Sequence, residues 1–104
     1  MKKLAKILPI LSLLFLVSCA PKSYDQGIAN LRENNWTVTG TMAFHLEDGV
    51  LISCYVAYFD SVDDAKAHKQ GLENTSSSSY VKQEGNWVLM GDRNTVNKCL
   101  RDLK

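Results

Sequence analysis

The polar side of one predicted β-strand carries the residues that come nearest to a metal site. His45, Glu47 and Asp48 lie within four positions, and imidazole and carboxylate groups are common ligands of zinc. His45 and Glu47 are two residues apart on an alternating strand, so their side chains would lie side by side. A zinc site takes three or four ligands, however. We therefore expect a solvated hairpin tip at these residues, with no bound metal and no cofactor.

His68 is the second residue suited to acid–base chemistry, because imidazole titrates near neutral pH. It falls on the inner side of a predicted helix, beside Ala65 and Leu72, where a partly buried, hydrogen-bonded histidine is expected rather than a catalytic base. Spacing alone places no serine or cysteine nucleophile beside either histidine. Two classes of function follow: a non-catalytic binding module, which we favour, and a small metal-dependent or hydrolytic enzyme that uses His45 or His68.

The N-terminal segment has the pattern of an export signal. Three lysines lie within the first six positions, and residues 7–17 are apolar apart from a proline and a serine. An apolar run of eleven residues is too short to cross a bilayer, which takes about 20. The cationic start, the short apolar run and the small residues after it indicate a targeting segment rather than a core helix of the fold.

The end of this segment, Leu16-Val17-Ser18-Cys19, resembles the lipobox of bacterial prolipoproteins. The resemblance implies that residues 1–18 are removed, that a diacylglyceryl group is attached to the sulfur of Cys19, and that Cys19 becomes the first mature residue. An ordinary secretory signal that ends in cysteine is the alternative. Residues 19–22 would then form a lipidated tether, and residues 23–104 a single domain on the extracytoplasmic side of the cell membrane or outer membrane.

Length and charge limit the partners of the mature chain. The 104 residues, 45% hydrophobic and 22% charged, suit one globular domain. The formal net charge is +1, but removal of three lysines with the signal leaves nine basic against eleven acidic residues. A slightly acidic domain has no electrostatic attraction to nucleic acid or to anionic lipid. We expect the lipid on Cys19 to supply the membrane contact and the partner to be an envelope or secreted protein.

Periodicity and turn residues predict an α+β domain of order αββαββα, a two-layer sandwich with a four-stranded antiparallel sheet. Helices are expected over 24–34, 61–74 and about 96–103, and strands over 36–47, 50–59, 80–83 and 87–91. Asp48-Gly49 predicts a two-residue hairpin turn. That turn sets the pairs Glu47 with Val50, Phe44 with Ser53, Met42 with Tyr55, and Val38 with Phe59. The second turn is Glu84-Gly85 or Gly85-Asn86, and the last helix begins at Asp92 or Asn94.

The stretch over residues 55–72, a strand that runs into an acidic helix start, resembles the strand-to-helix corner of small ferredoxin-like modules. The sporulation-related peptidoglycan-binding repeat is one such module. The resemblance implies a ferredoxin-like character for the fold and says nothing about glycan binding. The chain departs from that repeat, because a hairpin rather than a single strand precedes its helix.

The strand over residues 50–59 is apolar on both faces. Leu51, Tyr55 and Phe59 belong with the expected core face of the first strand, and the even-numbered residues share the opposite face with threonines. Either a helix covers that second face, or it is an exposed strip that binds a partner. The partner surface would then include Val50, Ile52, Val56 and Tyr58.

The same geometry decides whether the chain forms a disulfide. With Cys19 lipidated, an exported protein has one remaining pair, Cys54 and Cys99. If the last helix packs on the expected core face, Cys54 points away from Cys99 and the bond cannot form. If the helix packs on the other face, the two thiols can meet.

Overall fold

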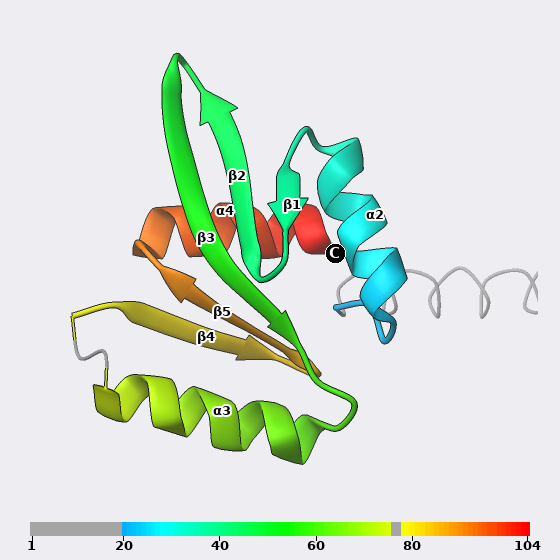
Figure 1. Cartoon of the computed structure of the whole chain (residues 1–104), viewed down its shortest axis with the longest axis vertical. Helices are drawn as coiled ribbons and strands as arrows, with labels where there is room; N and C mark the ends of the chain where they lie inside the picture. The colour runs from blue at the N-terminus through cyan, green and yellow to red at the C-terminus, as the bar shows by residue number, and fades with distance from the viewer. Residues whose placement is uncertain (1–19, 76–77) are drawn as a thin grey trace, which may run out of the picture.

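The computed structural model describes residues 20–75 and 78–104. The expected signal segment and the lipidation site Cys19 therefore lie outside the described residues. The elements are the helices α2 (Tyr24–Glu33), α3 (Val62–Thr75) and α4 (Arg93–Leu103) and the strands β1 (Thr37–Thr39), β2 (Met42–Glu47), β3 (Val50–Tyr58), β4 (Tyr80–Glu84) and β5 (Trp87–Gly91). The fold is α+β, as predicted, with the order αβββαββα (Figure 1).

The strand expected over residues 36–47 is two strands, β1 and β2, joined by a turn at Gly40-Thr41. Gly40 has a φ of +60°, a left-handed conformation that glycine adopts without steric cost. The chain reverses there, so that Thr39 pairs with Met42 and Val38 with Ala43. The predicted pairing of Val38 with Phe59 is therefore wrong. The sheet has five strands rather than four, all antiparallel, in the order β1-β2-β3-β5-β4.

The hairpin of β2 and β3 forms as predicted. Asp48 and Gly49 have φ values of 51° and 80°, the double positive φ of a type I′ turn. The three register pairs nearest this turn are confirmed: Glu47 with Val50, Phe44 with Ser53, and Met42 with Tyr55. The second hairpin turns over Gly85-Asn86, between β4 and β5.

Helices cover both faces of the sheet, so the fold has three layers rather than the expected two. On β5, Trp87 and Leu89 belong to the core beneath α2 and α4, whereas Val88 and Met90 pack with α3 on the opposite face. Helix α3 contacts mainly β4 and β5 and lies beside β4, far from β1 (Figure 1). Among the described residues, no helix therefore lies over the part of this sheet face that β1, β2 and the adjoining half of β3 form.

Capping residues and an amphipathic pattern account for the helix positions. Ser23 Oγ accepts from the backbone N–H of Gln26 at the start of α2, at 3.1 Å. Asp92, one of the two predicted start residues, caps α4 by accepting from the N–H groups of Asn94 and Thr95. The inner side of α4 is fully or nearly fully buried and consists of Thr95, Val96, Cys99, Leu100 and Leu103. The Asp92 cap thus fixes where α4 begins, and the buried side of α4 packs on one face of the sheet.

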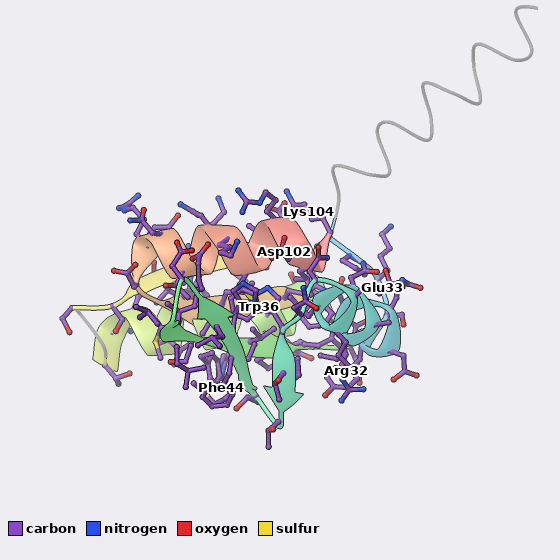
Figure 2. All side chains as sticks on the ribbon, turned by 90° about the horizontal axis from the view of Figure 1, so that it is seen from above. Arg32, Glu33, Trp36, Phe44, Asp102 and Lys104 are labelled. Atoms are coloured by element: carbon purple, nitrogen blue, oxygen red, sulfur yellow. The ribbon has the colours of Figure 1, made fainter. Side chains whose placement is uncertain are left out.

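Polar contacts join α2 to the C-terminal end of α4. Trp36, which follows α2, is 2% exposed, and its Nε1 donates to Asp102 Oδ2 at 2.8 Å. Figure 2 shows Trp36 between the sheet and α4, directly beneath Asp102. Asn30 Nδ2 donates to the carbonyl oxygen of Leu103, also at 2.8 Å. These bonds satisfy buried donors and fix the two helices on one face of the sheet.

Candidate functional site

The even-numbered face of β3, for which two alternatives were open, is covered by helices over most of its length. Val56 is 4% exposed and lies in the core beneath α2 and α4, and Ile52 and Tyr58 are half-buried against that core. Val50, at the hairpin tip, is 61% exposed. Of the four residues expected at a partner surface, only Val50 is thus largely exposed, and partner binding there stays a prediction.

The opposite face of the same hairpin, expected to be core, is the open one. Leu46 and Leu51 are 65% and 64% exposed, and Met42 and Phe44 are half-buried. Figure 2 shows Phe44 pointing away from α4. The expected placement of these residues in the core is therefore wrong, because α3 packs over β4 and β5 instead. We call Met42, Phe44, Leu46 and Leu51 the open face.

A groove lies next to the open face, at the C-terminal end of β3. It has a volume of about 450 Å³ and combines residues of α2, the β1–β2 turn, β3 and α3. Its lining residues, which we call the aromatic groove, are Tyr24, Gly40, Thr41, Tyr55, Val56, Ala57, Tyr58, Phe59 and His68. Since Tyr55 pairs with Met42, the groove and the open face form a continuous surface.

The groove exists because β3 extends beyond its neighbour β2. The last register pair between them is Met42 with Tyr55, and the N–H of Val56 still donates to the carbonyl oxygen of Thr41 at 2.7 Å. The turn at Gly40-Thr41 then carries the neighbouring chain away. Backbone groups alternate in direction along a strand, so Tyr58 directs its N–H and C=O to the same side as Val56. Within residues 20–75 and 78–104 this edge of β3 has no strand partner at Tyr58, and it borders the groove. The other edge of β3 pairs with β5, where Tyr58 lies opposite Trp87.

His68 is hydrogen-bonded within the groove to Tyr55. The Tyr55 hydroxyl and His68 Nε2 are 2.8 Å apart, their rings stack at 5.9 Å, and the Phe59 ring lies 4.8 Å from the imidazole. Burial raises the pKa of Tyr55 above its ordinary value of 10.0, so its phenol stays protonated at neutral pH. His68 is thus the partly buried, hydrogen-bonded histidine that its helix position predicted.

His45 lies on the other face of the sheet and has different partners. Its Nδ1 donates to the carbonyl oxygen of Asn35 at 3.2 Å, and its ring stacks on Trp36 at 5.0 Å. Glu47 forms an ion pair with Lys98 at 3.3 Å rather than with His45. In the described part of the chain His45 and His68 share no hydrogen-bond or stacking partner. The two histidines therefore do not form one site.

Residues 20–22, expected as a tether, are bound to the folded domain. Trp87 Nε1 donates to the carbonyl oxygen of Pro21 at 2.7 Å, and the Tyr58 hydroxyl donates to that of Lys22 at 2.8 Å. Ala20 packs against the core beneath α2 and α4. Tyr58 also lines the aromatic groove, so the start of the described chain and the groove share a side chain. Nothing in the sequence pattern indicated these contacts.

Residues 20–75 and 78–104 contain no group of three or more His, Cys, Asp or Glu side chains that could hold a metal ion. No helix within the same ranges is long and apolar enough to span a bilayer. No protein-family model, curated protein or solved structure matches the chain.

Proposed function

We propose that this chain is the precursor of a lipoprotein whose folded part is a non-catalytic binding module. Support for the anchor is the resemblance of Leu16-Val17-Ser18-Cys19 to a lipobox after a short cationic and apolar segment. A diacylglyceryl group on Cys19 would hold the protein on the extracytoplasmic side of the cell membrane or outer membrane, since two acyl chains anchor stably where one does not.

The binding site in this proposal is the aromatic groove, and its ligand is an extended peptide segment of an envelope or secreted protein. The observation that carries the proposal is the open edge of β3 at Tyr58, bordered by aromatic rings. An extended peptide can add its backbone to a free strand edge, and pockets beside that edge select its side chains. Tyrosine rings contribute large contact area at low entropic cost, which suits such a pocket.

The contacts of residues 20–22 support a ligand near the membrane. Pro21 is two residues after Cys19, which corresponds to at most about 7 Å of extended chain. The hydrogen bonds from Trp87 and Tyr58 fix Pro21 and Lys22 to the domain. A lipid on Cys19 would therefore hold the Tyr58 end of the groove close to the bilayer surface. The favoured ligand is a segment that its own protein presents at that surface.

Site-specific photo-crosslinking tests this proposal in cells that produce the full chain. A photoreactive phenylalanine analogue replaces Thr41, whose exposed side chain borders the groove. Thr41 bonds to Val56 through its backbone oxygen, which the replacement retains. The matched control carries the analogue at Lys66, an exposed position on α3 that does not line the groove. We expect position 41 to give an adduct with an envelope or secreted protein, and mass spectrometry to map the adduct to an extended segment.

Equal labelling from positions 41 and 66, or an adduct that maps to the surface of a helix, would exclude strand addition at the groove. Labelling with palmitate tests the anchor separately, because it reports on Cys19 whether or not the groove binds a peptide. The two halves of the proposal can therefore fail independently.

The alternative of a small enzyme that uses His45 or His68 has one supporting observation, the Tyr55–His68 hydrogen bond in the groove. A tyrosine that acts as a base or nucleophile needs a lowered pKa. Burial raises the pKa of Tyr55 instead. The pair is therefore better suited to shaping the groove wall, with its polar atoms satisfied, than to proton transfer.

A further inference from the structure

Two buried thiols lie in the same part of the core, between the sheet and α4. Cys54, in the middle of β3, is 1% exposed, and Cys99, on the inner side of α4, is 0% exposed. Both belong to the core cluster beneath α2 and α4. The Cys54 thiol donates to the carbonyl oxygen of Tyr55 at 3.3 Å. Helix α4 contacts β3, so the last helix packs on the face of the sheet that carries Cys54, the arrangement in which the two sulfurs can meet.

The backbone around the pair also permits close approach of α4 to β3. Gly91, at the end of β5, leads into α4, and a carbon atom added to it would lie 3.7 Å from Val96 Cγ2 and 4.0 Å from Cys54 Cα. Val96 is one helical turn before Cys99 on the same side of α4. The first half of α4 is thus packed directly against the strand that carries Cys54.

We propose that Cys54 and Cys99 become joined by a disulfide when the chain folds in the presence of a disulfide oxidant. Both sulfurs are reduced in the structure. The bond would join β3 covalently to α4 and close a loop that contains α3 and the β4–β5 hairpin. The proposal draws on the proposed export only as the source of an oxidising compartment.

The chemistry is a thiol–disulfide exchange in two steps with an oxidant such as oxidised glutathione. One cysteine loses its proton, and its thiolate attacks a sulfur of the oxidant, which forms a mixed disulfide and expels one reduced thiolate. The second cysteine loses its proton and attacks the bound protein sulfur, which expels the other half of the oxidant. The two expelled thiolates take up the two protons. One protein disulfide forms, and the oxidant is reduced to two thiols.

Because both thiols are buried in the folded protein, the disulfide would form during folding rather than after it. The contact with Cys54, burial and nearby negative charge all raise the pKa of Cys99, and a thiol that stays protonated is a poor nucleophile. An oxidant also cannot reach sulfurs that are 0–1% exposed. Once closed, the bond would be protected from reductants for the same reasons.

The test uses the full-length chain, unfolded with reductant and refolded in a glutathione redox buffer. After thiols are blocked by alkylation, trypsin should release residues 33–66, with Cys54, linked to residues 99–101, with Cys99. Cys19 falls in a third peptide, residues 7–22, so pairing with it is distinguishable. Reductant should split the linked peptide. Protein that is unfolded in reductant, so that the bond is exposed, and then refolded with reductant still present should melt about 15–30 °C lower than the oxidised protein.

Cys99→Ala is the matched control, and its melting temperature should not respond to reductant. Recovery of both peptides as separate alkylated species from the refolded protein would overturn the proposal. So would equal responses of the wild type and Cys99→Ala to reductant. Neither outcome bears on the peptide groove or on the lipid anchor, which the crosslinking and palmitate experiments test.

Discussion

Replacement of Gly27 by alanine tests whether helix propensity or core packing decides the stability of the protein at this position. Gly27 lies inside α2 and is buried. A Cβ atom at this position would overlap the ring of Trp87, with Cη2 at 2.5 Å, and would lie 3.0 Å from Leu103 Cδ1. Glycine costs a helix interior about 1 kcal/mol relative to alanine, so propensity alone predicts that Gly27→Ala stabilises the protein.

The packing predicts the opposite sign. Trp87 is fully buried, and its Nε1 is held by the carbonyl oxygen of Pro21 at 2.7 Å. Movement of the ring away from a new methyl group would weaken that bond, at about 1 kcal/mol. An added group in a filled core costs about 1–3 kcal/mol. After the gain of about 1 kcal/mol in helix propensity, we expect Gly27→Ala to lower the free energy of unfolding by about 1–3 kcal/mol.

The chain contains a matched control for this substitution. Gly71 is an exposed residue inside α3, and an added Cβ would have no atom within 4 Å. Gly71→Ala should therefore stabilise by about 0.5–1 kcal/mol. Both variants are compared with the wild type by urea unfolding, followed by circular dichroism at the helix band. If Gly27→Ala is as stable as Gly71→Ala, the close packing of α2 on Trp87 is not present in solution.

Three further substitutions test other parts of the structure. Gly49→Val should lower the free energy of unfolding by more than about 1 kcal/mol, because valine is strained at a φ of 80°. A decrease below about 0.3 kcal/mol in urea unfolding would contradict the two-residue turn at Asp48-Gly49. Val56→Asp should abolish the folded state, seen as loss of the cooperative thermal transition, because it buries a carboxylate. Leu51→Asp, on the open face, should change the melting temperature little, and equal effects of the two variants would refute the assignment of the two faces. Cys19→Ala should abolish incorporation of labelled palmitate and release the protein from the membrane fraction, and unchanged labelling would exclude lipidation at this residue.

Local signals in the sequence predicted the parts of the fold that depend on neighbouring residues. Asp48-Gly49 placed the β2–β3 turn and three register pairs, because a type I′ turn needs two residues that tolerate positive φ. The helix predicted over 24–34 begins at Tyr24, after the cap Ser23, and Asp92, one of the two predicted start residues, caps α4. Each of these features is decided within a few positions along the chain, where residue type determines the backbone geometry.

The choice of sheet face could not be predicted in the same way. Alternation along β3 shows which residues share a face, but not which helix covers that face. Residues such as Leu46 and Leu51 are as apolar as those in the core, yet they are exposed. The outcome depends on where α3 and α4 settle, which Ala65 and the stripe of Val96 and Cys99 determine through contacts distant in sequence.

The turn at Gly40-Thr41 links the main error in the predicted fold to the main candidate site. If residues 36–47 formed one strand, Val38 would pair with Phe59 and cover the whole edge of β3. In the structure the chain reverses at Gly40 and Val38 pairs with Ala43. Among the described residues, the edge of β3 that faces β2 then has no strand partner beyond Val56, while its other edge still pairs with β5. The Thr41 carbonyl makes the last bond to that edge, and the aromatic groove begins directly after it. A single glycine in an otherwise strand-like run thus adds the fifth strand and opens the edge on which the proposed peptide binding depends.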